Sequence, residues 1–123
     1  MCLQGASAAD RILREFPGKP VRAFVVWEPV LATDWTRPST AAMARIGDVR
    51  AAQFWDPGRL VSHAWGEHNR KSIVWDDISV YGPGTLWKYG PPQPLFRGRT
   101  VFRVQDGARN AVAQAVRNLQ QAP

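Results

Sequence analysis

Helix-type and strand-type patterns alternate along this chain, and that alternation constrains its fold more than any other feature. Residues 6–16 carry apolar side chains at the i, i+3, i+4 and i+7 positions of a one-sided helix, which ends before Pro17-Gly18. The next segment, residues 21–27, is β-branched and aromatic with little alternation, which is typical of a strand buried on both faces. This succession indicates an α/β domain.

The same alternation continues to the end of the chain. The further predicted elements are a short helix capped by Ser39 or Thr40, a helix begun by Asp56-Pro57 that fades by Asn69, strands over residues 73–81 and 100–104, and a closing helix capped by Asp106. A proline- and glycine-rich connection, residues 82–98, joins the two strands. The order α-β-α-β-β-α predicts a single domain over residues 1–123, with helices on both faces of a sheet.

The composition excludes several classes of protein. With 45% hydrophobic and 21% charged residues, the chain has the makeup of a globular domain rather than a disordered segment. Its longest apolar run, residues 23–27, is too short to cross a bilayer, and no signal peptide is visible. A single cysteine forms no internal disulfide, so we expect a cytoplasmic setting. We expect no cofactor.

Cys2 is the main candidate for chemistry. It stands at the start of the first predicted helix, where unpaired backbone N–H groups stabilise a thiolate. A thiolate there acts as a nucleophile or a resolving thiol. The alternative is an incidental cysteine in a frayed terminus, and the position alone leaves both interpretations open.

The stretch MCLQGASAADRILREFPGKPVRAFVVWEP, with a cysteine, a helix, a Pro-Gly stop and a buried strand, resembles the thioredoxin-like superfamily. The segments WEPVLATDW, AAQFWD and IVWDDISVY are similar to a bacterial branch of it. The resemblance implies a three-layer α/β sandwich whose N-terminal strand is missing here. The expected explanations are a strand upstream of Met1, a strand from another chain, which would make a dimer, or a different strand order.

The resemblance also implies a thiol-disulfide redox role for Cys2 together with a partner thiol outside this chain. Cys2 is either the second cysteine of a CxxC motif or the nucleophile of a single-thiol variant ending at Gly5. The family usually places a cis-proline directly before its third core strand, whereas residues 69–72 contain no proline. Whether the chain is an enzyme therefore stays open, and a domain that kept the fold and lost the chemistry is the other outcome.

A non-catalytic interaction domain is the alternative function. The net charge is +6 with scattered arginines, which favours loose attraction to an acidic protein partner and, less strongly, to nucleic acid. Trp35 and Trp87 fall in predicted loops beside Arg37 and Lys88. An exposed aromatic ring beside a cation stacks a base or anchors a protein partner, or else simply closes the core.

Three further groups of side chains receive structural interpretations. His63, Glu67 and His68 do not have the HExxH spacing, so we expect no metal site and only a surface pair between His63 and Glu67. Asp76-Asp77 interrupts an apolar strand, and we expect a salt bridge to an arginine there. The tryptophans within predicted elements are expected in the core: Trp27, Trp65 and Trp75.

Overall fold

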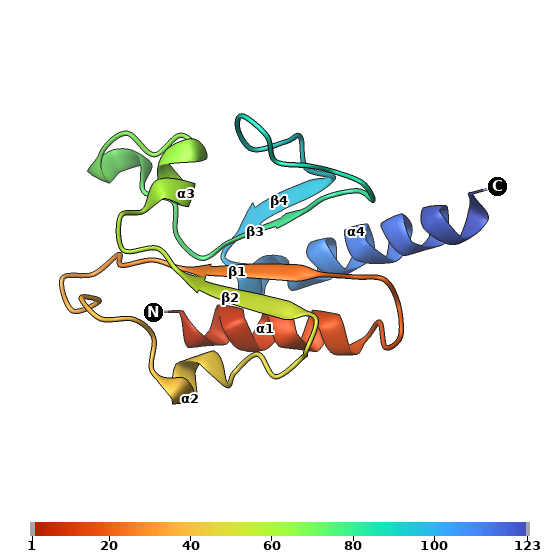
Figure 1. Ribbon diagram of the computed structural model, residues 1–123, viewed down its shortest axis with the longest axis horizontal. Helices are drawn as coiled ribbons and strands as arrows, with labels where there is room; N and C mark the ends of the chain where they lie inside the picture. The colour runs from red at the N-terminus through yellow and green to blue at the C-terminus, as the bar shows by residue number, and fades with distance from the viewer. Residues whose placement is uncertain (1, 123) are drawn as a thin grey trace.

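The computed structural model describes residues 2–122 and shows a mixed α/β chain (Figure 1). Its elements are α1 (Leu3–Arg14), β1 (Ala23–Trp27), α2 (Thr40–Met43), β2 (Ala51–Trp55), α3 (Leu60–Ala64), the 3-10 turn η1 (Arg70–Ser72), β3 (Asp77–Val80), β4 (Phe96–Arg99) and α4 (Val101–Gln121). No helix in residues 2–122 is both long and apolar enough to span a membrane.

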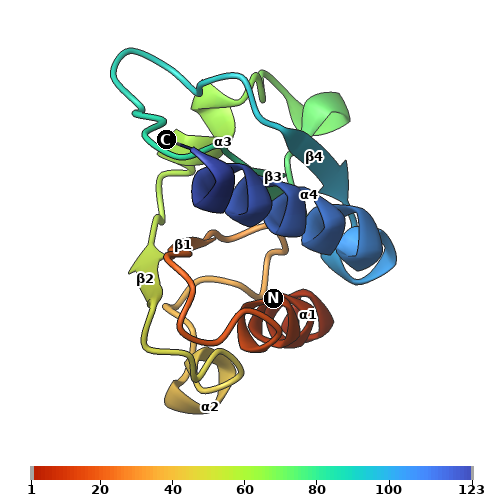
Figure 2. The same cartoon turned by 90° about the vertical axis from the view of Figure 1, so that its right-hand side faces the viewer.

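The four strands form two separate two-stranded sheets. β1 and β2 are parallel, with Ala23 opposite Ala51, and β3 and β4 are antiparallel, with Asp77 opposite Arg99. Figure 2 shows the strands from left to right in the order β2, β1, β3, β4. Within residues 2–122 no ladder joins β1 to β3.

One core lies between α1 and the β1–β2 sheet. Ala6 and Leu13 of α1 pack with Trp27 of β1 and with Ile46, which follows α2. The opposite face of this sheet is open, because the side chain of Phe24 is 68% exposed and that of Phe54 is 52% exposed. The prediction that residues 21–27 are buried on both faces is therefore wrong, because no helix of residues 2–122 covers the second face.

A second core lies between α1, α4 and the β3–β4 sheet. Ile12, Val80 and Ala108 are buried together, and Phe96 and Val112 pack against them. A Cβ atom at Gly107 would come within 2.6 Å of the Phe96 ring, so glycine is required where α4 crosses β4. Since Leu13 belongs to the first core and Ile12 to the second, α1 is the element that holds the two sheets together.

One local prediction is confirmed by a hydrogen bond. The hydroxyl of Ser39 accepts from the Ala42 amide at 3.1 Å and caps α2. The predicted helix start at Asp56-Pro57 is wrong, because α3 spans only Leu60–Ala64 and its N-cap is Arg59; the Asp56 carboxylate instead accepts from the Val61 amide at 2.9 Å across the intervening turn.

The predicted strand over residues 100–104 is wrong. These residues open α4, because Val101 and Ala108 are buried along one helical face while Phe102 is 45% exposed. The strand that pairs with β3 is residues 96–99, which the sequence placed at the end of the connection. Asp106 consequently lies inside α4 and does not cap it.

The predicted strand over residues 73–81 is shorter, and a strand after α2 went unpredicted. Asp76 has a φ of 47°, a left-handed conformation that ends the extended segment before β3. Trp75 is 46% exposed, so its predicted place in the core is wrong. β2 was missed, although its Gln53 accepts from the indole N–H of Trp27 at 2.9 Å across the sheet.

Candidate functional site

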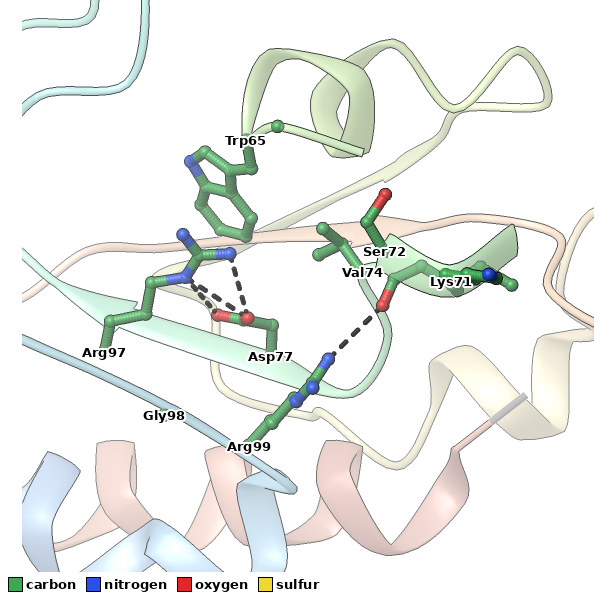
Figure 3. Close-up of a pocket in the computed structure, with 10 residues that line it drawn as sticks. Trp65, Lys71, Ser72, Val74, Asp77, Arg97, Gly98 and Arg99 are labelled. Carbon is green, nitrogen blue, oxygen red and sulfur yellow. Dashed lines mark hydrogen bonds and ion pairs between the residues drawn. The ribbon is translucent and has the colours of Figure 1, made fainter. Parts of the chain in front are cut away.

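A cavity of about 430 Å³ lies over the outer face of the β3–β4 sheet (Figure 3). Strand alternation builds its floor: Asp77 lies opposite Arg99 and Ser79 lies opposite Arg97, so all four share one face. The other face of this sheet packs on α4. The two arginines of β4 are thus directed toward the cavity by the same alternation that buries Phe96.

Trp65, which follows α3, and Arg97 form one wall of this cavity. The guanidinium of Arg97 lies 4.7 Å from the ring centroid of Trp65, and Asp77 accepts two hydrogen bonds from it, each at 3.1 Å. Trp65 also stacks on Trp87 with 6.1 Å between centroids and 18° between ring planes. The predicted salt bridge of Asp77 with an arginine is confirmed.

A buried ion pair fixes the segment that forms the upper wall. Arg59 binds the carboxylate of Glu67 and donates to the carbonyls of Pro29 at 2.7 Å and Val74 at 2.9 Å. Glu67 accepts from the Val74 amide at 2.8 Å, and the Arg59 guanidinium holds its pKa below the ordinary value. Residues 59–74 are therefore tied into a rigid frame around Trp65.

The 3-10 turn η1 places a lysine at the side of the cavity. Asn69 accepts from the Lys71 amide at 2.8 Å, and the hydroxyl of Ser72 accepts in turn from the Asn69 amide at 3.3 Å. This reciprocal cap holds the backbone of Lys71 while its side chain is exposed.

The cavity carries an excess of positive charge. Its charged lining residues are Lys71, Arg97, Arg99 and Asp77, three cations against one anion. Arg97 is paired with Asp77, whereas Arg99 donates only to the carbonyl of Ile73 at 3.3 Å. Among residues 2–122, no ion pair engages Lys71 or Arg99. We call Lys71, Arg97 and Arg99 with Trp65 the cationic pocket.

A second cavity of about 350 Å³ adjoins the cationic pocket. It shares Trp65, Gly66 and Arg97 with the first cavity and is otherwise lined by Ala64, Tyr81 and the proline-rich residues 91–94. The Trp65–Arg97 pair therefore separates a charged cavity from a less charged one.

Two carboxyl groups meet at the carboxyl ends of β1 and β2. Burial raises the pKa of Glu28, while the amide of Val61 and a hydrogen bond from Glu28 hold the pKa of Asp56 low against the effect of its own burial. Glu28 also accepts from the hydroxyl of the fully buried Ser62. Two carboxyl groups whose pKa values are shifted in opposite directions can act as an acid and a base, but Glu28 and Asp56 line neither cavity. We interpret it as the anchor of α3.

Cys2 is exposed at the N-cap position of α1, and its thiolate is not stabilised there. Partial burial raises the pKa of the thiol, and a hydrogen bond to Asp76 and the charge of that carboxylate raise it further. The backbone amide of Gly5 acts in the opposite direction and is outweighed. The helix N-terminus thus acts on this pKa in the expected direction, but burial of the thiol, and after it the Asp76 carboxylate at the mouth of the same helix, outweigh its effect.

The structure separates the two predicted tryptophan–cation pairs. Trp87 joins the cationic pocket by stacking on Trp65, and Lys88 is exposed beside it in the sequence. Trp35, 82% exposed, and the exposed Arg37 lie in the loop between β1 and α2 at the left of Figure 1, away from the loop that precedes β4. Neither has a described contact with the pocket.

The predicted His63–Glu67 pair is confirmed at 3.8 Å. Within residues 2–122 no group of three or more histidine, cysteine or carboxylate side chains has the arrangement of a metal site. Of the pocket residues, Trp65, Lys71, Arg97 and Arg99 were not predicted as a site. The sequence signal for the pocket was Arg97-Gly98-Arg99, because two arginines that are two residues apart lie on the same face of a strand.

Comparison of the chain with protein-family models, with curated proteins and with solved structures finds no match.

Proposed function

We propose that this chain is a non-catalytic interaction domain that binds an acidic partner in the cationic pocket. The observation that carries the proposal is that Lys71 and Arg99 line one cavity without a carboxylate partner within the described chain, beside an arginine already oriented by Asp77. A reducing, cytoplasmic setting is part of the proposal, because the only cysteine is a free thiol.

The frame around the pocket supports binding by a preorganised site. Arg97 is held by two hydrogen bonds and by the Trp65 ring, so little side-chain entropy is lost when it meets an anion. The Arg59–Glu67 pair holds the segment that carries Trp65. A carboxylate entering the pocket then gains charge-assisted hydrogen bonds without reorganising the protein.

The direct experiment is calorimetric titration with a hexaglutamate peptide at several salt concentrations. We expect the logarithm of the affinity to fall with the logarithm of the salt concentration, since several charges are neutralised together. The variant Lys71→Gln/Arg99→Gln should bind at least about tenfold more weakly, a loss of about 1.4 kcal/mol.

The matched control removes the same charge elsewhere. Arg45→Gln/Arg117→Gln changes two exposed arginines outside the pocket and should keep the wild-type affinity within about twofold. Equal losses in both double variants would contradict the proposal, because attraction would then follow net charge rather than the pocket. Arg37→Gln tests the loop pair in the same way and should have no effect.

Thiol exchange through Cys2 is a second candidate, favoured by the exposed position of Cys2 at the N-cap of α1, where the backbone amide of Gly5 acts to lower the pKa of the thiol. In this reaction the Cys2 thiol first loses its proton to solvent, the resulting thiolate attacks one sulfur of a partner's disulfide, and the other sulfur of that disulfide leaves as a thiolate. The resemblance of residues 1–29 to the start of thioredoxin-like proteins supports this candidate. A mixed disulfide that forms with oxidised glutathione in wild type and not in Cys2→Ser would favour it, and its absence at pH 8 would exclude it.

A further inference from the structure

We propose that the acidic partner is an extended peptide that adds to the free edge of β4 as a further strand, with carboxylates two residues apart reaching the cationic pocket. This inference rests on the proposed function, and it specifies the class of partner and its conformation.

The edge of β4 is available for strand addition. β4 pairs with β3 alone, so along its other edge alternate backbone N–H and C=O groups have no ladder partner. In Figure 2 it is the outermost strand at the right, and α4 lies across the face of the sheet rather than along that edge. An extended peptide can satisfy these groups by main-chain hydrogen bonds.

The side chains of β4 select an acidic peptide. β4 is the only described strand that carries cationic residues, since β1 and β2 contain no charged residue and β3 contains only an aspartate. Arg97 and Arg99 lie on one face, at the two-residue spacing that side chains of an added strand also have. A peptide with the pattern acidic–any–acidic therefore meets both arginines at once.

Lys71 extends this complementarity above the sheet. It lines the same cavity from η1. Arg99 donates to the carbonyl of Ile73, the residue that directly follows η1. Two carboxylates entering over Arg97 and Arg99 would thus be offered a third cation. A carboxylate bound in the pocket would form an ion pair with the ammonium group of Lys71.

The aromatic part of the pocket favours a peptide over single-stranded nucleic acid. Binding of single strands without sequence preference depends on open aromatic faces on which bases stack. The Trp65 ring already has Arg97 over it and Trp87 stacked on it. The edge of β4 also offers backbone groups, which a peptide matches and a nucleotide chain does not.

The experiment compares peptides of equal charge, so that the protein is unchanged throughout. The first peptide is acetyl-Thr-Thr-Glu-Val-Glu-Thr-Thr-amide, and the second has the same composition with adjacent glutamates. We expect the alternating peptide to bind at least about fivefold more tightly in calorimetric titrations, because adjacent side chains of a strand face opposite sides.

Two analogues of the alternating peptide test the backbone. One carries N-methyl groups on both glutamates and the other carries an N-methyl group on the central valine. In a strand at the edge of a sheet, only alternate residues direct their N–H to the neighbouring strand. One analogue should therefore bind at least about tenfold more weakly than the unmethylated peptide, and the affinity of the other should stay within about threefold of it.

The outcomes separate this inference from the proposed function. Binding that depends on Lys71 and Arg99, but is the same for both glutamate spacings and for both analogues, would overturn strand addition and leave the cationic pocket in place. Tighter binding of a ten-residue oligothymidylate than of the alternating peptide would also overturn it. Failure of every peptide to distinguish wild type from Lys71→Gln/Arg99→Gln would overturn the proposed function itself.

Discussion

The thiol of Cys2 and the carboxylate of Asp76 lie against each other at the N-terminus of α1. Their hydrogen bond raises the pKa of the thiol, in addition to the larger effect of partial burial. Between them stands Gly5, where any Cβ atom would overlap the Asp76 carboxylate. This contact joins the start of α1 to the turn before β3 and opposes ionisation of the Cys2 thiol.

Replacing Asp76 should therefore increase the reactivity of Cys2. We expect Asp76→Asn to lower the pKa of the thiol, because the like charge that opposes the thiolate is removed. The rate of alkylation by iodoacetamide, measured from pH 6 to pH 10, should rise at lower pH in this variant. Asp106→Asn, an exposed change in α4, is the control. An unchanged pH profile in Asp76→Asn would contradict the contact.

The close crossing of α4 and β4 predicts an unusual effect of alanine. Alanine is the better helix former by about 1 kcal/mol, so Gly107→Ala should stabilise α4 if packing did not matter. Its Cβ atom would overlap the Phe96 ring, and overpacking costs about 1–3 kcal/mol. We expect a lower free energy of unfolding in urea. Gly90→Ala, which has open space around it, should be nearly neutral, and a stabilised Gly107→Ala would show that α4 does not cross β4 this closely.

The Arg59 network is expected to dominate the stability of residues 59–74. Arg59→Met removes the partner of a Glu67 side chain that is only 9% exposed. Removal of one member of a buried ion pair costs about 3–5 kcal/mol, and urea unfolding should show a loss of about 3 kcal/mol. Arg37→Met in the exposed loop should stay within about 0.5 kcal/mol of wild type. A loss below about 1 kcal/mol in Arg59→Met would mean that the network adds little.

The Glu28–Asp56 pair predicts a dependence of stability on pH. Burial raises the pKa of Glu28 above its ordinary value of 4.5 in the folded state, so its contribution to stability is complete below pH 4.5 and is lost as the pH rises through the folded value. Glu28→Gln keeps a hydrogen-bond donor for Asp56 without a charge. We expect this variant to gain free energy of unfolding relative to wild type between pH 4.5 and pH 8, whereas parallel curves would contradict the raised pKa.

Part of the fold could be predicted from the sequence because it depends on local chemistry. The one-sided pattern of residues 6–16 corresponds to α1, and the Ser39 cap is a hydrogen bond within four residues. Residues 100–104 show the limit of such patterns. Thr100, Phe102 and Val104 alternate as in a strand, but burial of Val101 and Ala108 against distant elements selects a helix.

The site could not be predicted because its members are far apart in sequence. Trp65 was assigned to the core from its helical spacing, and only the register of β3 with β4 brings Arg97 beneath it. Of the predicted binding residues, Trp87 reaches the pocket through a ring contact that no spacing rule contains. Arg97 and Arg99 can be recognised as a pair on one face only when residues 96–99 are known to form a strand.

The most direct test of the cationic pocket is a nuclear magnetic resonance titration that follows arginine side-chain and tryptophan indole N–H signals during addition of hexaglutamate. We expect saturable shifts of the Arg97 and Arg99 Nε–H signals and of the Trp65 indole signal, whereas the signals of Arg45 and Arg117 should not move. Shifts spread evenly over all the arginines, or confined to Arg37 and Trp35, would contradict binding in the cationic pocket.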